Sequence, residues 1–200
     1  MNLLLIRHGQ SEADILGVME GRADFPLTSL GKEQAHAMAS WMKSQYQLDK
    51  IITSPLQRAA QTAEILKMHT GATLSYDDNL MEWQNGLVAG MPYQQAIEQC
   101  PLPDPKYPHT EVYEQESDIQ FRMRAETALS KIIHENAADA TIAVVSHNGL
   151  IGQLLQSFLR LPIQSGVYFE KMADTGIHQL EVSGNKRGVL ALNMQKHFKQ

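Results

Sequence analysis

The feature that most constrains the fold of this chain is a series of short apolar runs without charges, separated by longer amphipathic stretches. The runs lie at Leu3–Ile6, Ile51–Ile52, Thr141–Val145 and, more weakly, Thr73–Tyr76. Apolar residues recur at helical spacing between them, at about 28–46, 56–66, 116–135 and 148–159. Uncharged strands that alternate with amphipathic helices are typical of a parallel sheet covered by helices. We therefore predict an α/β fold, a three-layer α/β/α sandwich with a mostly parallel central sheet.

Local signals predict where several elements begin and end. Thr28 is expected to cap the helix that follows it. Ser54, Pro55 and Gln57 form a capping-box pattern, which predicts that Ser54 caps a helix starting at Pro55. The tail at 176–194 is divided by Gly184–Asn185 and predicts a C-terminal hairpin. This hairpin would add antiparallel strands at one edge of the sheet.

The length of the chain fits one domain. Its 200 residues are enough to bury a substantial core, and we expect residues 1–200 to form a single domain. The stretch at about 83–115 is irregular and contains five prolines. Insertions of this length in a compact domain are usually lids or binding loops. We therefore expect a lid-like excursion from the sheet there, not a linker between domains.

Charge and hydropathy argue against several classes of function. The formal net charge of −5 argues against nucleic acid as the main partner, because nucleic-acid binders concentrate positive charge. No apolar run approaches the length of a membrane span, and Arg7 interrupts the first run too early for a signal peptide. The single cysteine, Cys100, cannot form an internal disulfide. These features predict a cytoplasmic protein without a membrane partner, and they leave its oligomeric state open.

Polar residues follow three of the predicted strands at the point where each strand ends. They are Arg7–His8, the segment from Ser54 to Arg58, and Ser146–Asn148. Ligands of such sheets bind beyond the carboxyl ends of the strands, so two arginines and two histidines should meet there. The side chain of Arg58 should lean back toward the start of its helix, where free N–H groups attract anions. Such a group suits a tetrahedral oxyanion such as a phosphoryl group, and no metal site is expected.

Five sequence blocks resemble, in order, those of the histidine phosphatase superfamily, which also contains the cofactor-dependent phosphoglycerate mutases. The defining motif of that family is matched by Arg7-His8-Gly9. The other blocks are Glu20–Gly31 (EGRADFPLTSLG), Thr53–Ile65 (TSPLQRAAQTAEI), Leu80–Gly90 (LMEWQNGLVAG) and Val144–Ile151 (VVSHNGLI). Arg-His-Gly alone arises easily by chance, whereas five blocks in order over most of the chain are a specific signal.

The resemblance implies a role for each matched residue. His8 would attack phosphorus and form a phosphohistidine, and Glu82 would protonate the leaving oxygen and then activate a water molecule. The phosphoryl oxygens would be held by Arg7, Arg58 and His147. Further substrate contacts are implied at four positions, namely Gln10, Asp14, Gly21 and Asn148. Glu111, Glu114 and Glu116 stay open as alternative acids, and no cofactor is implied.

The chain also departs from the family pattern. The family often has asparagine where this chain has Asp14, and an anionic Asp14 would repel phosphate unless it were protonated, turned away or paired with Arg22. Between Trp83 and Phe121 the only lysine or arginine is Lys106, and apolar and aromatic residues are frequent. This composition favours hydrolysis of a small phosphomonoester with an uncharged or aromatic remainder. The alternatives are a phosphoglycerate mutase-like phosphotransferase and a phospho-ligand-binding protein without turnover.

Overall fold

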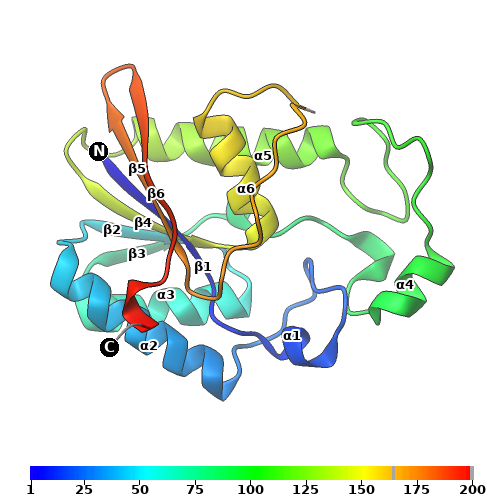
Figure 1. Cartoon of the computed structure of the whole chain (residues 1–200), viewed down its shortest axis with the longest axis horizontal. Coiled ribbons are helices and arrows are strands. Elements are labelled where there is room, and N and C mark those ends of the chain that lie inside the picture. The colour runs from blue at the N-terminus through cyan, green and yellow to red at the C-terminus, as the bar shows by residue number, and fades with distance from the viewer. Residues whose placement is uncertain (164, 199–200) are drawn as a thin grey trace.

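The computed structural model describes residues 1–163 and 165–198, within which six strands form one mixed sheet (Figure 1). The strands are β1 (Asn2–Arg7), β2 (Lys50–Thr53), β3 (Thr73–Tyr76), β4 (Thr141–Ser146), β5 (Ile177–Ser183) and β6 (Lys186–Met194), in the order β3-β2-β4-β1-β5-β6. The first four are mutually parallel, whereas β5 runs antiparallel to β1 and β6 antiparallel to β5. The predicted sheet, with its antiparallel C-terminal edge, is confirmed.

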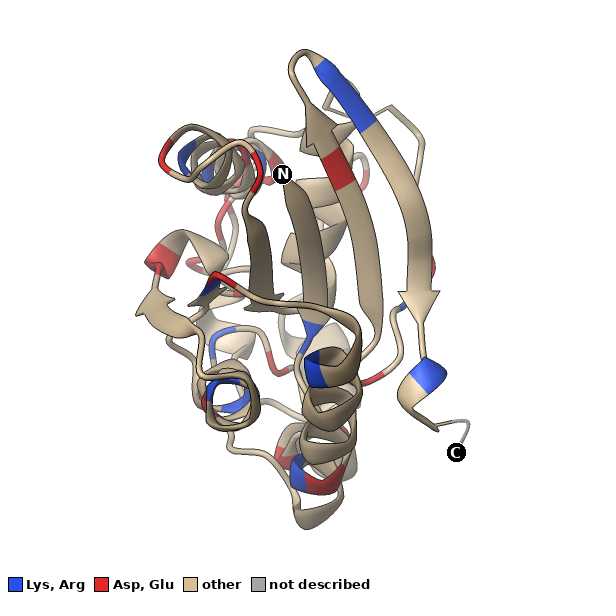
Figure 2. Cartoon of the chain, turned by 90° about the vertical axis from the view of Figure 1, so that its left-hand side faces the viewer, with Lys and Arg blue, Asp and Glu red and all other residues tan. Residues whose placement is uncertain are grey.

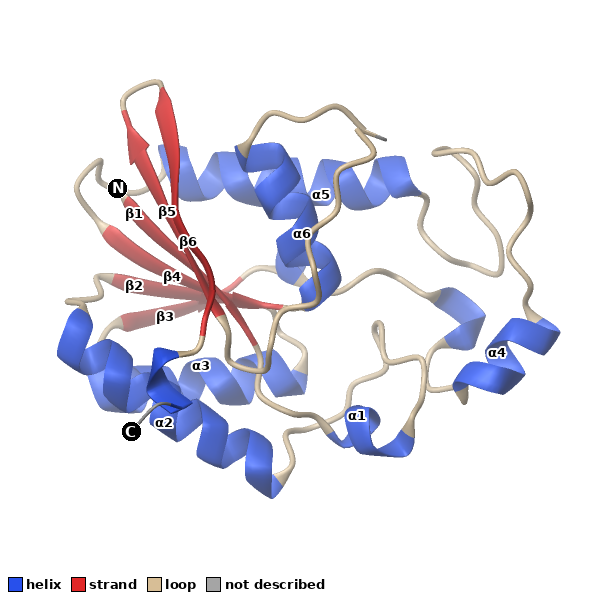
Figure 3. Cartoon of the chain, viewed as in Figure 1, coloured by secondary structure: helices blue, strands red, loops and turns tan. Residues whose placement is uncertain are grey.

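Helices cover both faces of this sheet and make the three layers visible in Figure 3. They are α1 (Glu12–Leu16), α2 (Ser29–Gln45), α3 (Gln57–Thr70), α4 (Tyr93–Gln99), α5 (Asp118–His134) and α6 (Asn148–Phe158), with short 3₁₀ turns η1 (Asp78–Leu80), η2 (Gly86–Val88) and η3 (Lys196–Phe198). Leu4 and Ile6 pack with α2 and α3, while Leu3 and Leu5 pack with α5 and α6. Full burial of each such side chain stabilises the fold by about 1.5–3 kcal/mol. Strand β1 is therefore held from both sides.

The middle of the sheet carries few charges. Figure 2 shows charged residues mainly on the helices, the loops and the hairpin of β5 and β6. Strand β4 has no charged residue, and β1 has only Arg7, at its end. Among the described residues, no helix combines the length and the apolar character needed to cross a membrane.

One predicted helix cap is confirmed and another is wrong. Thr28 Oγ1 accepts a hydrogen bond from the Gly31 N–H at 2.9 Å, as expected for the cap of α2. Helix α3 instead begins at Gln57, with Leu56 at the cap position. The Ser54 hydroxyl accepts a hydrogen bond from the Leu56 N–H at 3.3 Å and also lies 2.8 Å from His147 Nε2. The N–H of Gln57, the first residue of α3, instead donates to Asp24 Oδ1 at 2.7 Å, so a side chain distant in the sequence binds the start of this helix.

The stretch 83–115 contains η2 and α4 and extends away from the sheet, beside α1 (Figure 1). Backbone hydrogen bonds connect it to the loop after α1: Met19 N–H donates to Met91 at 2.8 Å, and Gly90 N–H donates to Met19 at 2.8 Å. An isolated antiparallel β-bridge between Asn85 and Gln115 joins the two ends of the stretch. Its function as a lid stays a prediction, as does the single domain.

Candidate active site

Three strands bring the predicted residues to one edge of the sheet. Strand β4 lies between β2 and β1, and Arg7 is in register with Ser146, so the segments that follow these strands start side by side. The rings of His8 and His147 lie with their centroids 5.2 Å apart. Arg7, His8, Arg58 and His147 are all buried, with at most 5% of each residue exposed. The convergence predicted from the strand ends is therefore present in the structure.

His8 is held by its backbone neighbour with one ring nitrogen left free. Its Nδ1 lies 2.7 Å from the carbonyl oxygen of Gly9, which can only accept, so the ring proton resides on Nδ1 and Nε2 keeps its lone pair. Burial, followed by the charges of Arg58 and Arg7, holds the pKa of His8 well below its ordinary value. The ring is therefore neutral near neutral pH, the form in which imidazole attacks phosphorus.

His147 is a second neutral imidazole beside the first. Burial lowers its pKa well below the ordinary value, and the charge of Arg58 is the next cause. Its Nε2 is bound to the hydroxyl of Ser54, whereas its Nδ1 is buried and has no hydrogen-bond partner among the described residues. Ser54 was predicted as a helix cap, and its contact with His147 could not be inferred from the local sequence.

The two arginines are held by carbonyl and carboxylate oxygens. Arg7 Nη1 lies 2.7 Å from Asp174 Oδ1, and Arg7 Nη2 lies 3.6 Å from Asp14 Oδ1. Arg58 donates to the carbonyl of Gly21 at 2.7 Å, and its Nε lies 3.3 Å from Glu20 Oε2. Both guanidinium groups are fixed in direction before any ligand arrives, which lowers the cost of ordering them on binding.

Glu82 is held at the start of α6. Its Oε2 accepts a hydrogen bond from the Gly149 N–H at 2.9 Å, and its Oε1 accepts one from the Trp83 N–H at 2.8 Å. A β-carbon at position 149 would collide with Glu82 Oε1. Gly149 therefore leaves the room that the carboxylate occupies, a requirement that appears only once α6 and the loop of Glu82 are packed together.

If Glu82 is the acid that the family resemblance implies, replacing Gly149 with alanine is expected to lower kcat for an alkyl phosphate about 10-fold or more, because a displaced acid loses part of its contribution to catalysis. The free energy of unfolding should not fall, since alanine is favoured over glycine in helices by up to about 1 kcal/mol. Steady-state kinetics and chemical denaturation measure the two effects. Gly152→Ala is the matched control, because Gly152 lies on the same helix with open space around it. Equal kcat in the two variants would contradict the positioning of Glu82 by Gly149.

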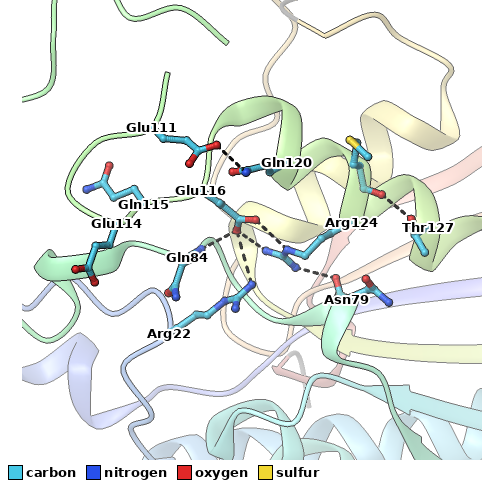
Figure 4. Close-up of a pocket in the computed structure, with 11 residues that line it drawn as sticks. Arg22, Asn79, Gln84, Glu111, Glu114, Gln115, Glu116, Gln120, Arg124 and Thr127 are labelled. Atoms are coloured by element: carbon cyan, nitrogen blue, oxygen red, sulfur yellow. Dashed lines mark hydrogen bonds and ion pairs between the residues drawn. The ribbon is translucent and has the colours of Figure 1, made fainter. Parts of the chain in front are cut away.

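The backbone that carries Glu82 is fixed by Arg124, a residue that the sequence did not single out. Arg124 donates to the carbonyls of Asn79 and Met81 at 2.9 Å each and to that of Glu82 at 3.1 Å. It also forms an ion pair with Glu116 at 2.6 Å. Figure 4 shows this pair in a hollow that both residues line.

The three glutamates that the sequence left open as alternative acids lie in this hollow. Glu111, Glu114 and Glu116 all line it, together with Arg22 and Arg124 (Figure 4). None of the three lines the cavity of His8, whereas Glu82 does. The geometry therefore favours Glu82 among the four carboxylates considered from the sequence.

The cavity that contains His8 has a volume of about 600 Å³. Its charged and polar lining includes Arg7, His8, Glu20, Glu82 and Lys171, whereas the buried Arg58 and His147 are not among the lining residues. Its apolar lining comes from Met19, Trp83, Tyr93, Leu102 and Phe121. Another lining residue, Lys106, has its Nζ 2.8 Å from Asp118 Oδ1 and 5.1 Å from the centre of the Trp83 ring.

The four further positions predicted to contact substrate have different surroundings. Asp14, Gly21 and Asn148 line the cavity, and Asn148 Oδ1 accepts a hydrogen bond from the Met172 N–H at 2.8 Å. Gln10 is not among the lining residues, because its Oε1 is bound by the Thr28 hydroxyl at 2.9 Å at the start of α2. The role of each of these residues toward a substrate stays a prediction.

Asp14 is paired differently from the ways considered in the sequence. Its Oδ2 accepts a hydrogen bond from the Ser11 N–H at 3.0 Å and closes a capping box on α1. Its other oxygen faces Arg7, whereas Arg22 lies 4.0 Å from Glu116. The expected alternative of a pair with Arg22 is therefore wrong, because the capping geometry directs Asp14 toward β1.

The chain is similar to known proteins over most of its length. The family model of the histidine phosphatase superfamily (branch 1) matches residues 3–195. The uncharacterized phosphatase PhoE of Bacillus subtilis (strain 168) is 30% identical over 151 residues, 76% of this chain and 74% of PhoE. The probable phosphoglycerate mutase GpmB of Yersinia enterocolitica is 31% identical over 166 residues, 81% of this chain and 76% of GpmB. The solved structure of Bacillus stearothermophilus YhfR has a TM-score of 0.86, covers 98% of both chains and is 24% identical.

Proposed function

Because this chain belongs to the histidine phosphatase superfamily (branch 1), we propose that it hydrolyses small phosphomonoesters through a phosphohistidine on His8. The observation that carries the proposal is the neutral, buried His8 ring with an unprotonated Nε2 in a cavity beside Arg7. A relative named as a phosphatase, PhoE, agrees with hydrolysis. A neutral imidazole beside a fixed guanidinium group supports this proposal, because phosphoryl transfer requires a nucleophile and positive charge held close together.

The first chemical step transfers the phosphoryl group to the enzyme. His8 Nε2 forms a bond to phosphorus while the bond to the leaving oxygen breaks. Glu82 acts as the general acid and gives a proton to that oxygen. Negative charge on the three non-bridging oxygens is stabilised by Arg7, Arg58 and His147.

The second step returns the enzyme to its starting state. The Glu82 carboxylate takes a proton from a water molecule, and the resulting oxygen attacks phosphorus while the bond to His8 Nε2 breaks. Inorganic phosphate leaves and Glu82 is again protonated, so one water molecule is consumed in each cycle. Contacts from the N–H groups of Gly149 and Trp83 hold the carboxyl group in place for both proton transfers.

A phosphotransferase of the phosphoglycerate mutase type is the second candidate, and the similarity to a relative named as a probable mutase favours it. A mutase must hold substrates with several negative charges. Much of the cavity lining is apolar, and of its two lining lysines Lys106 is paired with Asp118 whereas Lys171 forms no salt bridge with the described residues. The apolar lining favours a leaving group that is uncharged or aromatic, with water as the acceptor, and Lys171 leaves one positive charge for an anionic substrate.

A panel of phosphomonoesters tests the proposal. We expect release of inorganic phosphate, fastest from substrates with apolar or aromatic leaving groups. The value of kcat should be the same with and without a chelator, because the proposed mechanism uses no metal ion. We also propose that the enzyme is cytoplasmic. Interconversion of phosphoglycerates that is stimulated by 2,3-bisphosphoglycerate would favour the mutase instead. Phosphate binding without release would favour the binding protein, and loss of turnover in chelator would contradict the absence of a metal.

A further inference from the structure

Glu20 stands between the cavity and Arg58. Its carboxylate lines the cavity, and its Oε2 lies 3.3 Å from Arg58 Nε. Arg58 itself is completely buried and is not among the lining residues. A phosphoryl group that enters the cavity and interacts with Arg58 must therefore come close to Glu20.

The second oxygen of this carboxylate has no partner. Glu20 Oε1 is buried and receives no hydrogen bond from the described residues. An ionised carboxylate and a phosphoryl group have only acceptor oxygens, so they repel one another at close range. A protonated carboxyl group is a donor, and it would pair with a phosphoryl oxygen at the place where Oε1 is now left without a partner.

The charges around Glu20 come from three elements. Arg58 on α3, Arg7 at the end of β1 and Asp14 on α1 face it, and His8 and Glu82 share the same cavity. Burial raises the pKa of Glu20 above its ordinary value; Arg58, the nearby Ser11 side chain and Arg7 oppose this rise, and Asp14 adds to it. A bound phosphoryl dianion would bring further negative charge, which disfavours the ionised carboxylate.

We propose that Glu20 takes up a proton when a phosphoryl group enters the cavity and then donates a hydrogen bond to it. The inference rests on the proposed function, because it assumes that this cavity receives the phosphoryl group. One proton comes from solvent for each ligand bound, and no covalent bond changes. Glu20 is thus a binding residue that makes affinity for phosphoryl groups depend on pH, beyond the titration of the ligand itself.

The direction of this dependence follows from the two states of Glu20. The pKa of Glu20 is higher with phosphate bound than without. The affinity for phosphate therefore falls as the pH rises above the pKa that Glu20 has in the free protein. Each unit of difference corresponds to 10-fold in affinity. Glu20→Gln, which is neutral at every pH and still has a donor, is expected to bind inorganic phosphate about 10-fold more tightly than wild type at pH 8. This advantage should shrink toward pH 5.

Calorimetric titration with inorganic phosphate tests the proposal directly. At pH 7.5, in two buffers that differ in ionisation enthalpy, wild type is expected to take up about one proton more per phosphate than Glu20→Gln. Glu12→Gln is the matched control, because Glu12 is an exposed carboxylate on α1, and it should behave as wild type. Glu20→Ala should lose the proton uptake as Glu20→Gln does, but it should bind more weakly because it has no donor.

The outcomes separate this inference from the proposed function. Equal proton uptake by wild type and both Glu20 variants, with parallel pH profiles, would overturn the role of Glu20 and leave hydrolysis through His8 untouched. Hydrolysis that persists without His8 would overturn the proposed function while the calorimetric result on Glu20 stands. Failure of wild type to bind phosphate at all would overturn both. Thermal unfolding of each variant shows whether it is folded under the conditions of the titration.

Discussion

Replacing His8 with alanine is expected to reduce phosphomonoester hydrolysis by about 10⁴-fold or more, because the variant has no nucleophile to accept the phosphoryl group. The remaining cavity still holds Arg7 and Glu82, so binding of inorganic phosphate should be much less affected than kcat. Steady-state kinetics on one good substrate give the first quantity, and calorimetric titration with phosphate gives the second. The split between kcat and affinity is the signature of a nucleophile.

A control histidine makes the result specific. His134 is exposed, near the end of α5, and His134→Ala is expected to keep wild-type kcat. Wild-type enzyme stopped during turnover should carry phosphate on histidine, and His8→Ala should carry none when both are analysed by mass spectrometry of their peptides. Undiminished turnover by His8→Ala, or label on a different residue, would refute the mechanism.

Replacing Glu82 with glutamine is expected to slow turnover by about 10²–10⁴-fold for alkyl phosphates, whose leaving oxygen needs a proton. A substrate with a good leaving group, such as a nitrophenyl phosphate, should still load the enzyme. Hydrolysis of the phosphohistidine also needs Glu82, so rapid mixing should show a burst of nitrophenol close to one per enzyme, followed by slow turnover. The dependence on the leaving group separates a lost acid from a general loss of structure.

Glutamine also changes the local hydrogen bonding. Both partners of the Glu82 carboxylate are N–H donors, from Trp83 and Gly149, and an amide has only one oxygen to accept from them. Unfolding measurements on Glu82→Gln therefore accompany the kinetics. Glu114→Gln is the control, since Glu114 lines the neighbouring hollow and should retain wild-type activity. If Glu114→Gln shows the burst and Glu82→Gln does not, the acid has been misassigned.

Much of the fold could be predicted because it depends on local periodicity. The apolar runs at the two central strands and the helical spacing that follows each run are properties of contiguous residues. The gathering of Arg7, His8, Arg58 and His147 was predictable for a related reason, since parallel strands all end at one edge. In the structure the ring centroids of His8 and His147 lie 5.2 Å apart.

Other parts of the site depend on contacts between distant segments, for which a single sequence carries no local signal. Ser54 has the pattern of a helix cap, yet its hydroxyl also binds His147, which follows strand β4. Arg124 has the pattern of an ordinary helical residue, yet it holds three carbonyls around Glu82. In both cases the local pattern did not reveal a hydrogen bond that forms only when two distant segments pack together.

The sequence by itself therefore determined the layered α/β fold, the family, and the four buried arginine and histidine side chains, because short-range patterns and motif order encode them. Only the tertiary structure decided how their charges are balanced. It placed Asp14 and Asp174 on Arg7 and Glu20 on Arg58, pairings that join residues up to 167 positions apart. The physical reason is that a buried arginine must find an oxygen partner, and which partner is in reach depends on packing rather than on neighbours in the chain.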